Sequence, residues 1–350
     1  MNLFAGIDDI GDRDGTGVGE AGDSGAGARR CACAKVERVT VAALTYNRPQ
    51  GLKRLLDHLE KLDLGAAEAE TAVDVVIVDN SVEGNAAEAV LKRAETYRFP
   101  LHYAHETERG IAQARNLALQ EASRRGGHRL AFIDDDEYPE PLWLARMMRI
   151  ADETRAEIVV GALVPDFEVP PPLWLVRGEF LAIDALDDGA PVPVGNTSNV
   201  LFDVAFANRN DVRFDPSFAL TGGEDTLFFD EMVRAGAKMV FCRTGVVHET
   251  IAPVRNTLLW NARRWMRSGN TDGRIAMRRS PGAASRLLTA FCGGMARLLI
   301  GGGRAALTAP MAAFGRPEVP AGELRIACRG AGFVRAAFGS VIEEYRTHER

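Results

Sequence analysis

From Val39 onward, short runs of apolar and β-branched residues alternate with longer segments whose apolar residues recur at helical spacing. Four runs are predicted strands and three segments are predicted helices: 39–44, 73–78, 101–104 and 130–133, then 51–64, 85–97 and 110–125. This order favours parallel strands joined by right-handed crossovers, with helices on both faces of the sheet. The chain is therefore expected to be an α/β protein with a Rossmann-like sheet.

The rest of the chain differs in pattern from this region. Residues 1–35 are rich in Gly and Asp and have few large apolar side chains, so a disordered tail is expected there. We predict one domain over 36–270, with a regular half at 36–140 and a less regular half at 141–270. A helical C-terminal extension is predicted over 271–350.

The composition of the chain argues against several classes of function. The net charge of -6 argues against a general role in nucleic-acid binding, and no nucleic-acid-binding motif is visible. The five cysteines are scattered and are interpreted as free thiols in a reducing cytoplasm. No signal peptide and no run of about 18 apolar residues is found, so a cytoplasmic protein without a membrane span is expected.

The region beyond Pro253 is predicted to be mostly helical. Four arginines there fall on one face of an ideal helix: Arg279, Arg286, Arg297 and Arg304. Because the residues between them are strongly apolar, this segment is a candidate basic amphipathic helix on the inner face of the plasma membrane. The alternative is a helix that docks on the domain or on an oligomer partner. Glycines at 293–294 and 301–303 weaken any continuous helix here.

The fourth predicted strand ends on a block of acids, which is unusual for a buried strand. Asp134, Asp135, Asp136 and Glu137 follow it directly. Ligands of parallel sheets bind beyond the carboxyl ends of the strands, and adjacent carboxylates there favour Mg²⁺ or Mn²⁺. In an extended segment, Asp134 and Asp136 would face one side and Asp135 the other. The alternative is a solvated turn whose acids favour the dipole of the next helix.

Three further features lie at expected strand or helix ends. Asp79 ends the second strand, where it could instead be an ordinary turn former. Arg115 lies near the start of a crossover helix and could meet a phosphate or base, or form a surface ion pair. Glu224 and Asp225 follow two glycines and precede a helix, where a carboxylate could be a general base or simply cap the helix.

Seven segments, in order, carry a family resemblance: "TYNRP", "VIVDNS", "GIAQARNLAL", "FIDDDEYPEPLWL", "TSNVLF", "FDPSFALTGGEDTLFF" and "VVHE". Over residues 39–269 the chain closely resembles family 2 glycosyltransferases with the GT-A fold. The fit is best to the bacterial subgroup of succinoglycan-type exopolysaccharide glucosyltransferases. The resemblance implies a mixed, mostly parallel sheet flanked by helices.

The resemblance also implies that the chain binds a nucleotide sugar, usually a UDP-sugar. The implied donor-binding residues are Thr45, Tyr46, Asn47, Arg48, Asp79, Arg115, Asp134 and Asp135. Among them, Asp79 would accept the uracil N–H, and Asp134 would approach the ribose or the sugar.

An inverting transfer to a hydroxyl of a glycan or lipid-linked acceptor is implied as well. Asp225 matches the general base of the family, and Glu224 and Gly223 would contact the donor or acceptor sugar. Asp136 would bind Mn²⁺ or Mg²⁺, and His248 matches a position that adds a metal or diphosphate contact.

The chain departs from processive relatives, which carry a Gln-x-x-Arg-Trp motif and several membrane spans. Asn261 stands where the Gln would be, so addition of a single sugar is expected. Trp265 could be a sugar-stacking platform or ordinary packing. The competing interpretations are a nucleotide-sugar-binding protein without catalysis and a nucleotidyltransferase. Nucleotidyltransferases of this architecture usually have a Gly-rich phosphate-binding loop after the first strand, and no such loop is found between residues 44 and 55.

Overall fold

The computed structural model describes residues 36–181, 186–219, 221–279 and 282–342. The predicted tail over 1–35 lies outside the described residues, as do the last residues of the predicted extension.

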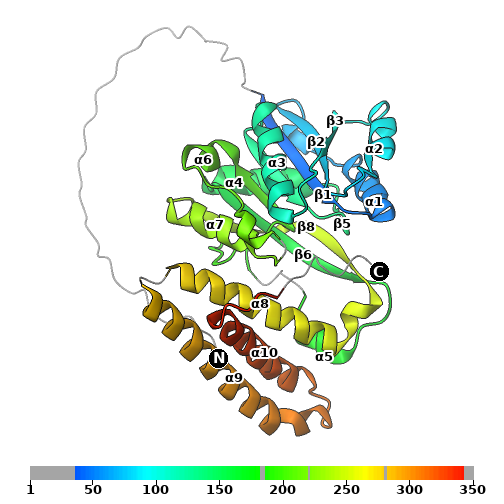
Figure 1. Cartoon of the computed structure of the whole chain (residues 1–350). Helices are drawn as coiled ribbons and strands as arrows, with labels where there is room; N and C mark the ends of the chain where they lie inside the picture. The colour runs from blue at the N-terminus through cyan, green and yellow to red at the C-terminus, as the bar shows by residue number, and fades with distance from the viewer. Residues whose placement is uncertain (1–35, 182–185, 220, 280–281, 343–350) are drawn as a thin grey trace, which may run out of the picture. The chain divides into compact units, whose positions relative to one another are not determined.

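Within the described residues, one mixed sheet contains eight strands in the order β3-β2-β1-β4-β7-β6-β8-β5 (Figure 1). Their bounds are β1 Glu37–Thr45, β2 Thr71–Asp79, β3 Leu101–His105, β4 Arg129–Ile133, β5 Glu137–Pro139, β6 Ile158–Phe167, β7 Asn199–Asp203 and β8 Met239–Ile251. As predicted, β1 to β4 are parallel, whereas β7 runs antiparallel to both β4 and β6. The sheet is therefore mixed and mostly parallel.

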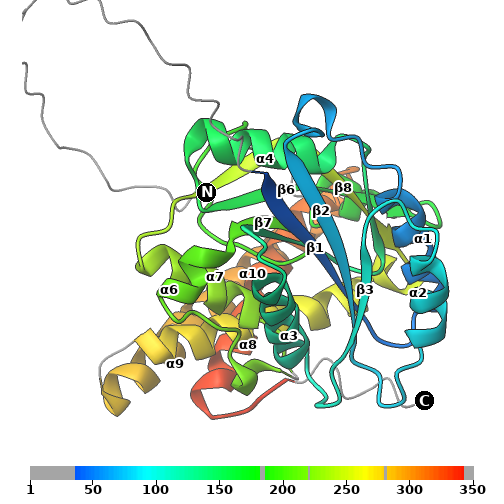
Figure 2. The same cartoon turned by 90° about the horizontal axis from the view of Figure 1, so that it is seen from above.

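Helices cover both faces of this sheet (Figure 2). The helices of the first face are α1 Pro49–Leu59, α2 Ala87–Ala94 and α4 Trp143–Thr154. The helices of the second face are α3 Ile111–Arg124, α6 Val204–Arg209 and α7 Glu224–Arg234. Val41 of β1 packs into the first core and its neighbour Ala42 into the second, as the alternation of side chains along a strand requires.

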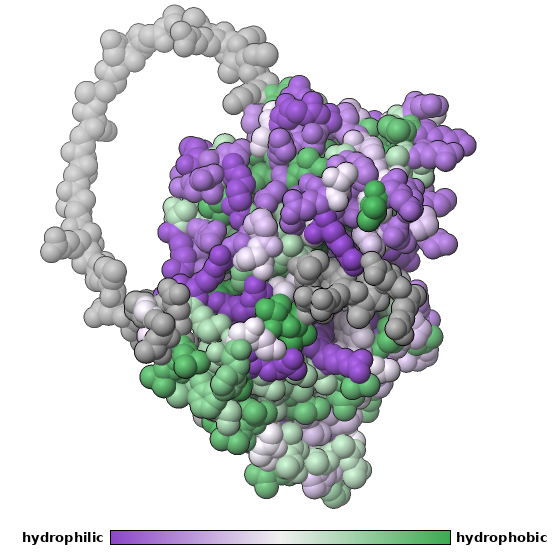
Figure 3. Space-filling view, viewed as in Figure 1, coloured by the Kyte–Doolittle hydropathy of each residue, from purple (hydrophilic) through white to green (hydrophobic). Residues whose placement is uncertain are grey.

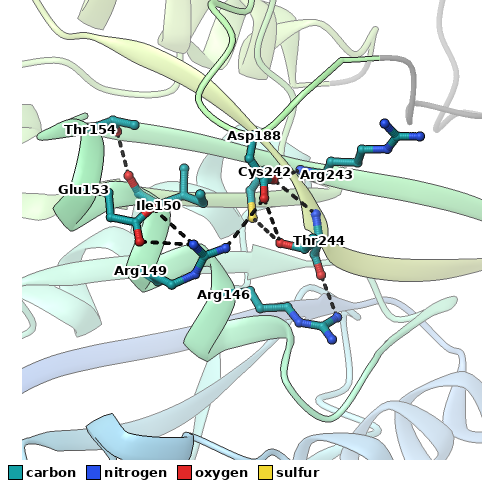
Figure 4. Close-up of polar contacts among 9 residues, drawn as sticks. All are labelled: Arg146, Arg149, Ile150, Glu153, Thr154, Asp188, Cys242, Arg243 and Thr244. Carbon is teal, nitrogen blue, oxygen red and sulfur yellow. Dashed lines mark hydrogen bonds and ion pairs between the residues drawn. The ribbon is translucent and has the colours of Figure 1, made fainter.

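Strand β8 contains a bulge that changes its register against β6. Gly161 of β6 pairs with Cys242 and the next residue pairs with Val246, so three residues of β8 are extra. Asp188 accepts hydrogen bonds from the backbone N–H groups of Arg243 and Thr244 at 2.6 and 3.3 Å (Figure 4). The bulge therefore has its own polar support, and it sets which face the second half of β8 presents.

Asn199 supports the same bulge from inside the sheet. Its buried side chain donates to the carbonyls of Ala162 and Gly245, both at 2.8 Å, and accepts from the Trp143 indole at 2.8 Å. Carbonyls that lose their partner strand at the bulge thus accept hydrogen bonds from a buried side chain instead.

Three long helices follow the sheet domain: α8 Leu258–Arg279, α9 Ala283–Thr308 and α10 Glu318–Ala337. Helix α10 lies between α8 and α9 (Figure 1). Glycines allow this close packing, since a Cβ on Gly332 would overlap the Met266 carbonyl of α8, and a Cβ on Gly301 would meet the backbone of Ala327. Of the five glycines expected to weaken a helix in this region, Gly294 and Gly301 serve this close packing, and α9 continues through all five.

The predicted single face of four arginines is wrong. Arg279 belongs to α8, while Arg297 and Arg304 of α9 turn towards α10. The Arg297 guanidinium lies 4.8 Å from the centre of the Phe333 ring, and Arg304 forms an ion pair with Glu323 at 2.6 Å. The ideal-helix projection failed because it treated as one helix residues that belong to two separate helices, α8 and α9. No helix in the described part of the chain has the length and apolarity needed to cross a bilayer.

Close packing at Gly332 predicts a sharp difference between two glycines of α10. Gly332→Ala should lower the free energy of unfolding by about 1–3 kcal/mol, because the added methyl group has to displace helix backbone. Gly322→Ala is the matched control: a Cβ there meets nothing within 4 Å, and alanine should stabilise the helix by up to about 1 kcal/mol. Equal thermal denaturation midpoints for the two variants would contradict this packing account.

Candidate active site

The carboxyl ends of three parallel strands meet at one edge of the sheet. Thr45 at the end of β1 lies in register with Asp79 at the end of β2, and β4 runs beside β1 on the other side. The hydroxyl of Thr45 donates to Oδ2 of Asp135, just after β4, at 2.9 Å. The structure thus brings together the strand ends that were predicted to converge.

The aspartates after β4 form a turn rather than an extended segment. The backbone N–H of Glu137 donates to the carbonyl of Asp134 at 3.1 Å, which closes the turn. Asp135 is buried, whereas Asp134 and Asp136 keep part of their exposure. Asp134 and Asp136 are therefore the more accessible pair, as expected, but a turn produces this arrangement instead of strand alternation.

Two arginines neutralise part of this acidic turn. Arg48, at the start of α1, lies 3.0 Å from Asp135 and 3.1 Å from Asp136. Arg255 lies 3.3 Å from the same Oδ2 of Asp136 and also pairs with the buried Glu249 of β8. Asp136 is thus held between two guanidinium groups from opposite ends of the domain sequence.

Arg255 and Glu249 were missed by sequence reasoning. Arg255 lies in a short 3₁₀ segment, Pro253–Asn256, and its carbonyl accepts a hydrogen bond from the buried Asn261 amide at 2.7 Å. The position where processive relatives carry Gln therefore supports the backbone of Arg255 here. Glu249 is the last residue of the "VVHE" segment, and this was the only available signal.

Even with these arginines, the turn carries an excess of carboxylates. Glu137 and Glu249 lie directly opposite each other in the β5–β8 pair, and both are buried. Burial, together with the neighbouring carboxylates, raises the pKa of Asp134 to about 7 and that of Asp135 to about 6, even though Arg115 and Arg48 oppose the rise. Burial also raises the pKa of Glu137 well above its usual range. The edge of the sheet is therefore short of positive charge.

This charge imbalance fits a divalent cation. Oxygen ligands suit Mg²⁺ and Mn²⁺, and Mg²⁺ is commonly bound by one or two carboxylates together with phosphates of the substrate. Among the described residues, no group of three or more His, Cys, Asp or Glu side chains could hold a metal ion by itself. A cation here would need oxygens from a bound ligand besides those of Asp136 and Asp134.

Asp79 organises the loop after β2. Its carboxylate accepts the backbone N–H groups of Ser81 and Ala86 at 2.9 and 2.8 Å, and the Tyr103 hydroxyl at 3.2 Å. Burial and the Asp79 charge raise the pKa of Tyr103 to about 12. Three of about four acceptor positions of the carboxylate are used, which leaves room for one more donor.

The loop after β1 is shaped by Asn47. Its backbone has a left-handed φ of 55°, which asparagine tolerates, and its side chain accepts from Asn85 at 2.8 Å. Tyr46 is partly exposed and lies under the guanidinium of Arg109, 5.9 Å from the ring centre. Asn80, which follows Asp79 at the end of β2, donates to the carbonyls of Glu106 and Glu108 at 2.9 and 2.8 Å and so ties β2 to the loop before α3.

Arg115 connects this edge to the start of α7. It forms a buried ion pair with Glu224, and its guanidinium lies 5.9 Å from the centre of the Phe214 ring. Arg115 is also near enough to Asp134 to oppose the rise of the pKa of that carboxyl. Arg115 is therefore not a surface ion pair: it bridges the acid turn and the first residue of α7.

Two glycines position Asp225 in the first turn of α7. Gly222 and Gly223 have φ values of 74° and 93°, and a Cβ on Gly223 would overlap the side chain of Thr271 in α8. Oδ1 of Asp225 accepts the N–H of Thr226 at 2.6 Å, and the side chain remains partly exposed. A carboxylate that is exposed beside a buried ion pair suits proton transfer to a ligand.

His248 and Trp265 lie in aromatic surroundings. His248 stacks on Tyr138 with ring centres 5.1 Å apart, and its Nε2 lies 3.7 Å from Glu140. Trp265 is buried against Trp174 of α5 (Leu173–Arg177) and against Phe180, with ring centres 6.3 and 5.2 Å away. The packing role of Trp265 is therefore visible, whereas its contact with a sugar, like the metal contact of His248, stays a prediction.

These features define an α/β protein with an acidic ligand-binding edge, and sequence comparison specifies the family. The profile of Glycosyl transferase family 2 matches residues 40–210. The succinoglycan biosynthesis protein ExoM of Rhizobium meliloti (strain 1021) is 30% identical over 244 residues, which cover 70% of this chain and 77% of ExoM. The chain belongs to glycosyl transferase family 2, which confirms the resemblance found in the sequence.

A solved structure with a TM-score above 0.5 identifies the fold. The mannosyltransferase PcManGT from Pyrobaculum calidifontis, in complex with GDP-Man and Mn²⁺, has a TM-score of 0.52 at 22% identity and covers 84% of this chain and 86% of its own. Residues 1–349 of S. aureus TarS, in complex with UDP, have a TM-score of 0.49 at 16% identity over 89% of this chain and 98% of theirs. This chain covers 43% of a longer TarS structure. The fold is the GT-A fold, as expected.

The pairing of Arg255 with Glu249 predicts a loss of stability when one partner is removed. Arg255→Ala leaves Glu249 buried opposite Glu137, so the free energy of unfolding should fall by about 2–3 kcal/mol in urea denaturation at neutral pH. Adding Glu249→Gln should restore about half of the loss. Arg243→Ala, at an exposed ion pair with Asp187, is the control and should cost under about 1 kcal/mol. If Arg255→Ala is as stable as Arg243→Ala, the ion pair between Arg255 and Glu249 does not contribute to the stability of the fold.

Proposed function

We propose that this protein is an inverting glycosyltransferase that moves a sugar from a nucleotide-sugar donor, a UDP-hexose, to a hydroxyl of a glycan or lipid-linked acceptor. Membership of family 2 supports sugar transfer, and the relation to ExoM supports a role in exopolysaccharide or other cell-surface glycan synthesis. The observation that carries the proposal is the position of Asp225. It is a partly exposed carboxylate, and the Arg115–Glu224 ion pair beside it extends to the acid turn after β4.

The donor is proposed to bind along the strand ends of β1, β2 and β4. Thr45, Tyr46, Asn47, Arg48 and Asp79 would surround the nucleotide, with Asp79 using its remaining acceptor position for a base N–H. Arg115, Asp134 and Asp135 would complete the donor site. Arg48 and Arg255 would then contribute positive charge beside the diphosphate.

Asp136 is proposed to hold Mn²⁺ or Mg²⁺, with His248 as a further contact. A divalent cation bound there would neutralise the charge that grows on the departing diphosphate. Asp225 would take the proton of the acceptor hydroxyl as that oxygen attacks the sugar carbon, and the bond to the diphosphate breaks on the opposite side. Glu224 and Gly223 would contact the donor or acceptor sugar, and the buried Trp265 would act through packing of that region.

A donor panel tests this proposal. UDP-, GDP- and TDP-sugars are incubated with membrane lipid extract, with and without Mn²⁺, while nucleotide release and labelled product are followed. Metal-dependent release of UDP together with a glycosylated product is the expected result. In a parallel reaction with UTP and a sugar 1-phosphate, release of pyrophosphate would indicate a nucleotidyltransferase. Donor binding without any release would indicate a binding protein.

Asp225 is the residue whose replacement should separate transfer from donor binding. Asp225→Asn removes the base but keeps the size of the side chain, so the transfer rate should fall by about a hundredfold or more. The affinity for UDP, measured by calorimetry, should stay unchanged. Asp230→Asn, on the same helix and paired with Arg234, is the matched control and should transfer normally. Equal turnover by Asp225→Asn and the native protein would remove Asp225 from the base role.

Asp136 should be needed for metal-dependent donor binding. In the native protein, Mn²⁺ is expected to increase the affinity for the nucleotide sugar, and Asp136→Ala should abolish that increase because a ligand of the cation is lost. Asp57→Asn, which changes a carboxylate on the surface of α1, serves as the control. The assignment fails if Asp136→Ala binds the donor with unchanged affinity and unchanged dependence on Mn²⁺.

A further inference from the structure

The outward side of α9 is apolar over most of the length of the helix. Around an ideal helix, Ser285 and Thr289 fall on this side near its start, and the rest of the side consists of apolar residues and glycine: Leu288, Cys292, Met295, Ala296, Leu299, Ile300, Gly303, Ala306 and Leu307. These residues are called the outer face of α9 below. The leucines are well exposed, with 63% for Leu288, 66% for Leu299 and 81% for Leu307. Figure 3 shows apolar residues gathered over this part of the molecule.

The direction of this face follows from what the other side of α9 contacts. Ala290, Gly294 and Gly301 are buried, and a Cβ on either glycine would meet α10. Helix α9 therefore uses its small residues for packing and turns its large apolar residues away from the protein. Exposed leucines in this number are unusual, since surface helices normally turn polar residues outward.

The surroundings of the outer face are basic. Residues 283–342 contain seven arginines and two glutamates, whereas the whole chain has a net charge of -6. Helix α9 itself has arginines and no acid. Beside the outer face, the side chain of Arg304 is 48% exposed even though it pairs with Glu323. Apolar area bordered by arginines is complementary to a bilayer with anionic headgroups.

We propose that the outer face of α9 rests on the surface of a bilayer that contains anionic lipid. The leucines and Ile300 would enter the boundary between headgroups and acyl chains, while Arg304, which keeps about half of its side-chain exposure, would lie beside the phosphates. No described helix is able to span a bilayer, so contact is parallel to the surface. This inference depends on α9 and its surroundings and not on the proposed transfer reaction.

A second copy of the chain fits this surface less well. In a two-fold symmetric dimer, the outer face of one α9 would lie against that of the other, which would bring two sets of arginines together. Because α9 carries no acid, that helix could not neutralise the arginines of its partner. Lipid phosphates supply the missing negative charge.

Vesicle flotation with the full chain tests the proposal without any glycosyl transfer. The protein is mixed with vesicles of phosphatidylcholine alone or of equal parts phosphatidylcholine and phosphatidylglycerol. It should float with the mixed vesicles and much less with phosphatidylcholine, and high salt should weaken the binding. The double variant Leu288→Glu/Leu299→Glu should lower the bound fraction about tenfold. Leu91→Glu, at an exposed leucine of α2, is the matched control and should float like the native protein.

Leu307→Glu, at the opposite end of the face, provides an independent variant if circular dichroism shows that the double variant is misfolded. Failure of the native protein to float with either vesicle would overturn the proposal. So would flotation of both outer-face variants at the native level. A native dimer in sedimentation equilibrium that Leu307→Glu converts to a monomer, without vesicle binding, would assign the face to a second copy instead.

Discussion

Carboxylates crowded at the edge of a sheet destabilise a protein unless positive charge lies among them, and this constraint shapes the site. Four acids in a row follow β4, and β8 places Glu249 against the last of them. Arg48 and Arg255 offset only part of this charge, and burial together with the neighbouring carboxylates raises the pKa of Asp134 to about 7. A fold that keeps such an imbalance is suited to a ligand that brings a cation with it.

Elements far apart in the chain are needed to build this edge. The bulge in β8, supported by Asn199 and Asp188, sets the register in which Glu249 meets β5. Asn261 then holds the backbone of Arg255 beside the acid turn. The geometry of the acids thus depends on buried amide groups that contribute no charge themselves.

The regular part of the fold could be predicted because its signals are local. Strands β1 to β4 have β-branched and apolar runs, and the leucines of α1 recur at helical spacing, so both were found within a few residues. Strand β5 was missed since its three residues include an acid and a proline. Helix α7 begins at Glu224 itself, whereas the sequence pattern placed Glu224 and Asp225 just before a helix. The pairing of Asp136 with Arg255 depends on contacts across 119 residues, and no local pattern encodes it.

Helix α8 joins the site to the C-terminal helices. On one side, Arg274 donates to the Thr221 hydroxyl and the Ser217 carbonyl at 2.6 and 2.8 Å, which fixes the loop before Asp225. On the other side, Gly269 and Gly273 let α10 approach closely, and α10 in turn carries α9. A surface on which α9 rests would therefore have a defined orientation relative to the start of α7. For an acceptor attached to a lipid, that orientation would decide whether its hydroxyl can reach Asp225.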